Sequence, residues 1–179
     1  MTEQRVSARY ARALLDAAKD QAATEEILKD LEYISRVAEK SHDFRTMIES
    51  PVIYNWQKKK VISEIFETKI SKITLQFLLL LADKKRESLI FDIIEQYRRI
   101  FNKRNNRLPI KVVSAVELSN DLKEKIAGKI SLWTEKTVLP SYAVDSSLKG
   151  GLKVEIEDWI FDATLKNQLD VLYHTLAKN

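Results

Sequence analysis

Histidine, cysteine and glycine carry much of the catalytic and metal-binding chemistry of proteins, and this chain of 179 residues is poor in all three. Its two histidines, His42 and His174, lie in different halves of the sequence, and neither has a second ligand four residues further on. A zinc site or a general base needs convergent partners, so we interpret both as ordinary, partly exposed side chains. The absence of cysteine excludes a thiol nucleophile and a cysteine-based zinc site. The sequence therefore predicts a protein that is not an enzyme and needs no metal or cofactor.

Gly150 and Gly151 are the only adjacent glycines in the sequence. They lack the third glycine and the following helix that a dinucleotide-binding fingerprint requires, and the sequence contains neither a Walker phosphate loop nor a nucleophile elbow. We expect this pair to form a turn or bulge at the start of a strand, where a positive φ is needed.

Basic residues gather in three places, within a formal net charge of +4. The clusters are Lys58-Lys59-Lys60, Lys84-Lys85-Arg86, and Arg98-Arg99 with Lys103, Arg104 and Arg107. A nucleic-acid-binding surface would need such clusters on one face, and the interleaved Glu87, Asp92 and Glu95 weaken that interpretation. We interpret the clusters as solvated helix ends, and a basic helical nucleic-acid-binding protein remains the alternative.

The first part of the chain has helical periodicity up to about Asn106. Six segments carry it, with apolar positions that begin at Val6, Ile27, Phe44, Val61, Ile73 and Leu89. Thr24 is a candidate N-cap for the second helix, and Pro51 follows the third. The polar residues 102–107 end the pattern. The sequence thus predicts a mainly α protein, with a six-helix bundle at 1–106 and a second domain at 107–179.

The second part is predicted to be a small α+β unit. Residues 110–116 are rich in β-branched side chains and predict a strand, and Ser119 can cap a helix that runs to about Lys136. Residues 138–139 and 142–144 are two short strand candidates. Residues 152–156 alternate apolar and charged, and a turn at 157–158 predicts a hairpin with 159–161. A final helix carries Leu165, Leu169, Leu172 and Leu176.

Two helices are more apolar than a surface helix of a bundle should be. Residues 77–82 are apolar for about a turn and a half, and the first helix carries two adjacent apolar stripes with small alanines. One interpretation is a central helix covered by its own neighbours. The other is a groove that accepts a helix from another chain. The pattern alone leaves both open.

Four stretches together resemble the delta-subunit family of the F-type ATP synthase, whose mitochondrial member is the oligomycin-sensitivity-conferring protein. They are residues 7–14 (Ser-Ala-Arg-Tyr-Ala-Arg-Ala-Leu), 113–119, 145–154 (Asp-Ser-Ser-Leu-Lys-Gly-Gly-Leu-Lys-Val) and 160–169. Residues 80–86 also resemble the end of the family's fifth helix. The resemblance covers essentially the whole chain. It marks Asp145, Ser147, Gly150, Gly151 and Asp162 as a structural motif, while Lys149 and residues 161–164 depart from the family pattern.

The resemblance implies a non-catalytic stator subunit that links the catalytic head to the peripheral stalk, so that the head does not turn with the rotor. In this family, the first and fifth helices form a groove for the N-terminal helix of an alpha subunit. Here the groove residues would be Tyr10, Ala13, Leu14, Ala17, Phe77, Leu78 and Leu81. On that assignment Leu78→Asp or Ala13→Asp should release the alpha-subunit peptide from a folded bundle.

The implied partner of the second domain is the C-terminus of the b-subunit stalk, and no nucleic acid is expected. The longest apolar run has six residues, far fewer than the ~20 that span a bilayer. The first residues resemble neither a secretory signal nor a transit peptide. We therefore expect a peripheral protein at the cytoplasmic face of the bacterial inner membrane, in contact with the membrane only through the complex.

Overall fold

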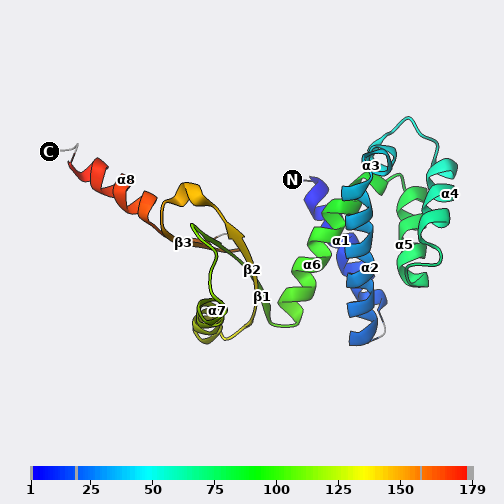
Figure 1. Ribbon diagram of the computed structural model, residues 1–179. Helices are drawn as coiled ribbons and strands as arrows, with labels where there is room; N and C mark the ends of the chain where they lie inside the picture. Colours follow the sequence, from blue (N-terminus) through cyan, green and yellow to red (C-terminus); the bar gives the residue numbers. More distant parts are fainter. Residues whose placement is uncertain (1, 19, 158, 177–179) are drawn as a thin grey trace. The chain divides into compact units, whose positions relative to one another are not determined.

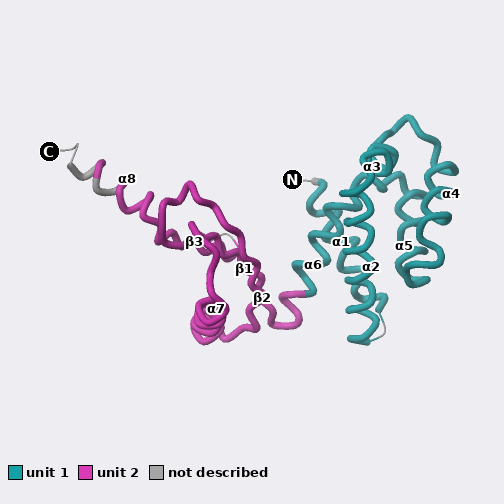
Figure 2. The backbone as a smooth tube through the Cα atoms, viewed as in Figure 1, with its two compact units in different colours: residues 1–101 teal, residues 102–179 magenta. Residues whose placement is uncertain are grey.

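The chain divides into two compact units, residues 1–101 and 102–179 (Figure 2). We describe them from a computed structural model, which covers residues 2–18, 20–157 and 159–176, without the side chains of residues 2, 171, 172 and 174–176. The division falls within the last turn of a helix, whereas the sequence placed the domain boundary at 106/107, where that helix has ended and a strand begins.

The first unit consists of α-helices with one short 3-10 turn (Figure 1). The helices are α1 (Thr2–Ala17), α2 (Gln21–Lys40), α3 (His42–Glu49), α4 (Asn55–Phe66), α5 (Lys72–Asp83) and α6 (Ile90–Arg104), with the 3-10 helix η1 (Glu87–Leu89) before α6. All six predicted helical segments are therefore present.

Side-chain caps decide where several helices begin. The carboxylate of Asp20 accepts a hydrogen bond from the backbone N–H of Ala23 and caps α2. The prediction of Thr24 as the cap was wrong, because Thr24 lies inside the first turn and donates its hydroxyl to the carbonyl of Gln21. Ser41 ends α2 and also caps α3 through the N–H of Phe44.

Two buried hydrogen-bonded groups tie the helices of this unit together. Asp30 of α2 accepts hydrogen bonds from the backbone N–H of Ser71 and the hydroxyl of Thr74, at the start of α5. The hydroxyl of Tyr97 in α6 donates to the carbonyl of Thr24 in α2. Around them lies an apolar core, which includes Leu14, Ile27, Leu31, Ile34, Ile48, Ile62, Phe66, Leu78, Leu81, Ile93, Ile94 and Phe101. Burial of this core supplies the main driving force for the bundle.

The second unit contains a four-stranded sheet in the order β2-β1-β3-β4. Its elements are β1 (Arg107–Ser114), α7 (Asn120–Thr134), β2 (Thr137–Val144), the 3-10 helix η2 (Ser146–Leu148), β3 (Gly151–Ile156), β4 (Trp159–Thr164) and α8 (Leu165–Leu176). The hairpin and the Ser119 cap of α7 are confirmed. The two short strand candidates form one continuous edge strand, β2, parallel to β1.

One face of this sheet carries its apolar core and the other carries charges. Val112 of β1 lies opposite Val154 of β3, and both pack with Ile126 and Ile130 of α7. On the opposite face, Glu155 forms ion pairs with Lys153 and Lys111. The alternation of apolar and charged residues in β3 is thus an alternation of faces.

Candidate partner-binding surfaces

The rings of Tyr10 in α1 and Phe77 in α5 pack edge to face, with centroids 6.4 Å apart and an interplanar angle of 66°. This contact makes α1 and α5 neighbours in the first unit, as the predicted groove requires. Ala13 and Ala17 follow Tyr10 at helical spacing and are exposed, while Tyr10 itself is partly exposed. The α1 side of the predicted groove therefore lies at the surface.

Four of the seven predicted groove residues are buried in the bundle. Leu14, Phe77, Leu78 and Leu81 all belong to the apolar core. The exposed leucine of α5 is Leu80, which is 45% exposed and lies three residues after Phe77. We refer to Tyr10, Ala13, Ala17, Phe77 and Leu80 as the α1/α5 strip.

The burial of Leu78 also changes the expected behaviour of Leu78→Asp. Leu78 is 2% exposed, so an aspartate there would place an unpaired carboxylate in the core. That variant is expected to unfold the bundle, and Leu80 is the position at which to test binding. A run of consecutive apolar residues contains no polar position to show which side faces water, so the sequence could not identify Leu80.

A second apolar surface lies on the sheet of the second unit. Phe161 of β4 is opposite Val154 of β3, and Trp159 is opposite Ile156, so both aromatic side chains lie on the core face. Helix α7 packs chiefly against β2, where the hydroxyl of Tyr142 donates to the carbonyl of Lys123. Trp159 and Phe161 remain 80% and 66% exposed. The core face is thus apolar across β4 without being covered there.

Helix α8 adds exposed apolar side chains to the same unit. Leu165, Leu169 and Tyr173 recur every four residues along one side of the helix, and all three are exposed. The side chains of Leu172 and Leu176, which the sequence placed in the same apolar pattern, lie outside the described residues, as does that of His174. His42 is described and is exposed at the start of α3.

The predicted motif residues connect the turn before β3 to the start of α8. Gly151 pairs with Thr164, and the N–H of Leu165 donates to the carbonyl of Gly150. Gly151 has φ +76°, as predicted, and a Cβ there would collide with the carbonyl oxygen of Ala163. The left-handed conformation and the close approach of β4 together explain why glycine occupies this position.

The two aspartates of the motif, Asp145 and Asp162, each accept a hydrogen bond from the backbone N–H two residues further on. Hydrogen bonds from the hydroxyl and N–H of Ser147 hold the pKa of Asp145 below its usual value. The hydroxyl and N–H of Thr164 lower the pKa of Asp162 in the same way, with Lys153 and Lys166 adding to the effect. Both carboxylates therefore stabilise backbone turns, which is a structural role.

Four residues of the basic clusters form ion pairs with acids of the same unit. Lys59 pairs with Asp83, Lys60 with Glu64, and Arg98 with Glu95. Lys58 was predicted to be solvated and is instead 1% exposed, bound to Glu87. This pairing leaves less free positive charge for a phosphate backbone than the sequence suggests.

Exposed apolar surfaces on both units define the chain as a helical subunit that binds other proteins. It belongs to the ATP synthase delta (OSCP) subunit family, whose model matches residues 6–176. The chain is 36% identical to ATP synthase subunit delta of Chlorobium phaeobacteroides over 172 residues, which is 96% of each chain. It is 35% identical to that of Moorella thermoacetica in an alignment of 182 positions, which covers 99% of each chain.

The fold is also similar to that of a chain in a solved assembly. A chain in the cryo-EM structure of the Toxoplasma gondii mitochondrial ATP synthase hexamer matches with a TM-score of 0.75 at 20% identity. The match covers 96% of this chain and 97% of that one. It therefore extends over both units.

Proposed function

We propose that this chain is a non-catalytic stator subunit of the rotary ATP synthase, which links the catalytic head to the peripheral stalk. Its membership of the delta (OSCP) family supports this role. The observation that carries the proposal is that each unit exposes an apolar surface of its own, because a linker must bind two partners at once. The comparisons give no support to the nucleic-acid alternative.

The head contact is proposed to be the α1/α5 strip, occupied by the N-terminal helix of an alpha subunit. The small side chains of Ala13 and Ala17 let another helix backbone approach closely, while Tyr10 and Leu80 offer larger apolar area on either side. An amphipathic helix in an apolar groove is a recurrent mode of peptide recognition. The buried Phe77 would form the floor between the two helices.

The stalk contact is proposed to be the uncovered part of the sheet in the second unit. Trp159 and Phe161 continue the apolar face beyond α7, and aromatic residues of this kind often dominate binding energy. The proposed partner is the C-terminal helix of the b subunit, whose apolar side would complete the core of the unit.

The mechanism is mechanical. Rotation of the central shaft tends to drag the catalytic head with it, and the linkage must resist this torque without dissociating. A nanomolar complex corresponds to about −12 kcal/mol, and buried apolar contacts act mainly on the dissociation rate. Two separate contacts on one chain would hold head and stalk together.

The proposed location is the cytoplasmic face of the bacterial inner membrane, reached through the complex. Among the described residues, no helix is both long and apolar enough to cross a bilayer. As a member of this family, the chain is a peripheral component of a membrane complex. Its contact with lipid is therefore proposed to be indirect.

Calorimetric titration of the full chain with a synthetic peptide, taken from the N-terminus of the same organism's alpha subunit, tests the head contact. We expect tight one-to-one binding with a negative heat-capacity change. Ala13→Asp and Leu80→Asp should weaken it strongly, because each places a charge in the strip. Leu132→Asp is the matched control, since Leu132 is 83% exposed on α7 in the other unit. Equal affinity in all four proteins, each folded by circular dichroism, would refute the strip as the head contact.

A further inference from the structure

Three arginines lie in a row on the exposed side of α1. Arg5, Arg9 and Arg12 occupy positions i, i+4 and i+7, so their side chains share one side of the helix. All three are exposed, and together with the small Ala8 they line an open hollow of about 400 Å³. We refer to Arg5, Arg9 and Arg12 as the arginine row.

The arginine row borders the α1/α5 strip. The guanidinium carbon of Arg9 lies 6.0 Å from the centre of the Tyr10 ring, and Tyr10 belongs to the strip. Ala13, the next exposed member of the strip, follows Arg9 by four residues and is therefore its neighbour on the helix surface. A helix seated on the strip would have one of its sides next to the row.

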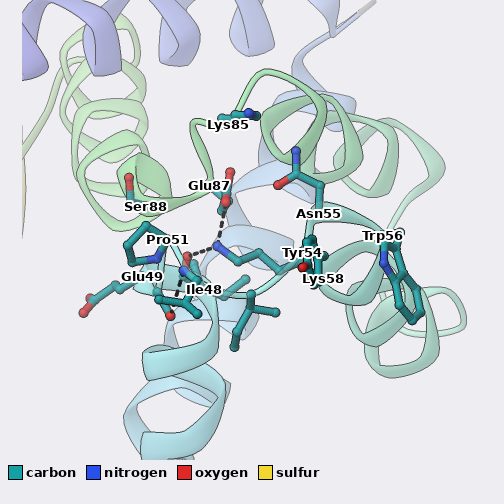
Figure 3. A pocket seen from close by; sticks show the side chains of 13 residues that line it. Ile48, Glu49, Pro51, Tyr54, Asn55, Trp56, Lys58, Lys85, Glu87 and Ser88 are labelled. Carbon is teal, nitrogen blue, oxygen red and sulfur yellow. Dashed lines mark hydrogen bonds and ion pairs between the residues drawn. The ribbon is translucent and has the colours of Figure 1, made fainter.

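The charges of the row are not neutralised within the unit. None of the three arginines forms an ion pair with an acid among the described residues. Asp16 follows Arg12 by four residues, but a base that precedes an acid is the less favourable order for such a helical pair. Lys58, by contrast, lines another hollow of this unit and is paired with Glu87 (Figure 3). The arginine row thus keeps its charge for a partner.

The row is also unfavourable for the helix that carries it. Like charges four residues apart repel each other, as Arg5 and Arg9 do. Arg5 lies in the first turn of α1, where the helix dipole disfavours a cation. The stability of the bundle therefore gains little from these charges. A feature that opposes local stability is typical of a functional site.

The chemistry of the row favours carboxylates. Guanidinium groups bind carboxylates through two parallel hydrogen bonds, and the small Ala8 leaves space for such groups between the arginine side chains. The other helix of the strip adds no free negative charge. Helix α5 contains one acid, Asp83, which pairs with Lys59, and it also carries the exposed Lys72. An acidic helix is therefore favoured over a basic one.

We propose that the arginine row selects an acidic partner: the helix that occupies the α1/α5 strip carries carboxylates along one side, and these pair with the row. The inference rests on the function proposed above, because it concerns the occupant of the strip, and it describes the polar side of that one contact. Exposed ion pairs add little to the final affinity and act mainly on the rate of association. The row guides the peptide to the strip, and the apolar contacts then hold it.

Stopped-flow measurement of the full chain with a labelled peptide from the N-terminus of the alpha subunit tests this role. Arg9→Gln combined with Arg12→Gln should slow association about tenfold at low salt and leave the dissociation rate nearly unchanged. At about 1 M salt, where the Debye length is about 3 Å, wild type and variant should associate equally fast. Lys129→Gln combined with Lys136→Gln is the matched control, because it removes two cations from the second unit and should behave as wild type.

A second peptide, in which every aspartate and glutamate is replaced by its amide, tests the partner groups. It should associate with wild type as slowly as the unmodified peptide associates with the double arginine variant. The double variant should not slow it further, because the two changes remove the same interaction. An equal effect of the variant on both peptides would show that the arginines do not meet carboxylates, and would overturn the proposal.

The remaining outcomes separate this proposal from the function on which it rests. Unchanged association of the double variant at low salt, with binding lost in Ala13→Asp, would overturn the role of the row and leave the strip as the head contact. If that variant lost affinity only for a generic DNA duplex, the row would belong to a nucleic acid. A folded wild-type chain that does not bind the peptide would overturn the strip and the row together.

Thermal melting of the free chain tests for a purely structural role. The double arginine variant should melt no lower than wild type, because it removes repulsion within α1 and breaks no ion pair among the described residues. A clearly lower midpoint would show that the arginines stabilise the bundle, and would count against a role in partner selection.

Discussion

The carboxylate of Asp30 in α2 lies 2.8 Å from the hydroxyl of Thr74 in α5, and the same oxygen also accepts the backbone N–H of Ser71. Asp30 is largely buried, so these two donors replace the water that it loses on folding. Because Ser71 caps α5, the contact fixes where that helix begins. It also holds in place the helix that carries Phe77 and Leu80 of the α1/α5 strip.

Asp30→Ala should therefore destabilise the bundle. The change leaves the N–H of Ser71 and the hydroxyl of Thr74 without their acceptor, which should cost about 2–4 kcal/mol of unfolding free energy. Urea titration followed by helical circular dichroism measures the change. Glu39→Ala, an exposed position late in α2, should change the unfolding free energy by less than about 0.5 kcal/mol. Similar midpoints for the two variants would argue against a special role for Asp30.

Lys58→Met should be more damaging than any other substitution in the three-lysine run. It leaves the buried Glu87 carboxylate without its cation, which should cost about 3–5 kcal/mol. Lys60→Met is the control, because its pair with Glu64 is exposed and spans one helical turn. Chemical denaturation of both variants gives the comparison. A Lys58→Met protein as stable as Lys60→Met would show that the buried pair contributes little.

Gly151→Ala and Gly128→Ala should shift stability in opposite directions. At Gly151 the positive φ and the nearby carbonyl of Ala163 strain any side chain, at about 1–3 kcal/mol. At Gly128, inside α7, a Cβ meets nothing within 4 Å, so alanine should stabilise the helix by about 0.5–1 kcal/mol. Amide exchange in β1 and β3 reports both changes. Wild-type protection in Gly151→Ala would mean that the turn adapts.

The second unit should lose stability as the pH falls below about 4, near the ordinary pKa of an aspartate. The folded-state pKa of Asp162 is lowered, so the folded unit binds fewer protons than the unfolded chain. Stability from this carboxylate is therefore present above the unfolded pKa and is lost as the pH falls through the folded pKa. Asp162→Asn keeps an acceptor and removes the charge, so its unfolding should depend less on pH between about 5 and 3. Parallel pH profiles for the two proteins would contradict this.

Phe161→Asp and Ile160→Asp distinguish the two faces of β4. Both residues are exposed, but Phe161 lies opposite Val154 on the apolar face, and Ile160 lies opposite Glu155 on the charged face. If the stalk binds the apolar face, only Phe161→Asp should lower the affinity for a peptide from the C-terminus of the b subunit. Fluorescence anisotropy of that peptide measures the affinity. Equal losses in both variants would place the contact elsewhere.

Local sequence signals predicted the elements well. Apolar periodicity and turn residues are signals that lie within a few positions of each other. They predicted the six helical segments, the Ser119 cap and the β3–β4 hairpin. The two short strand candidates merged into β2 because Pro140 interrupts the apolar pattern without interrupting the strand. Pro140 is tolerated because β2 lies at the edge of the sheet.

The sequence could not show which residues that are far apart in the chain contact each other. Lys58 was misjudged because its partner Glu87 is 29 positions away, while its neighbours in the run are ordinary surface lysines. The outward side of α5 could not be read either, because residues 77–82 include no polar residue. The α1/α5 pairing came from family resemblance, and the exposed members of the strip came only from the structure.

The two units differ in how much apolar core each one buries. Among the described residues, the buried apolar side chains of the second unit are Leu108, Ile110, Val112 and Val154, against a core several times larger in the first. A small core gives a low free energy of local opening, and proteases cleave chains through such open states. We therefore expect an unassembled copy to be cleaved first in its second unit and an assembled copy to resist. Such selective turnover would match the supply of this subunit to the number of complexes that incorporate it.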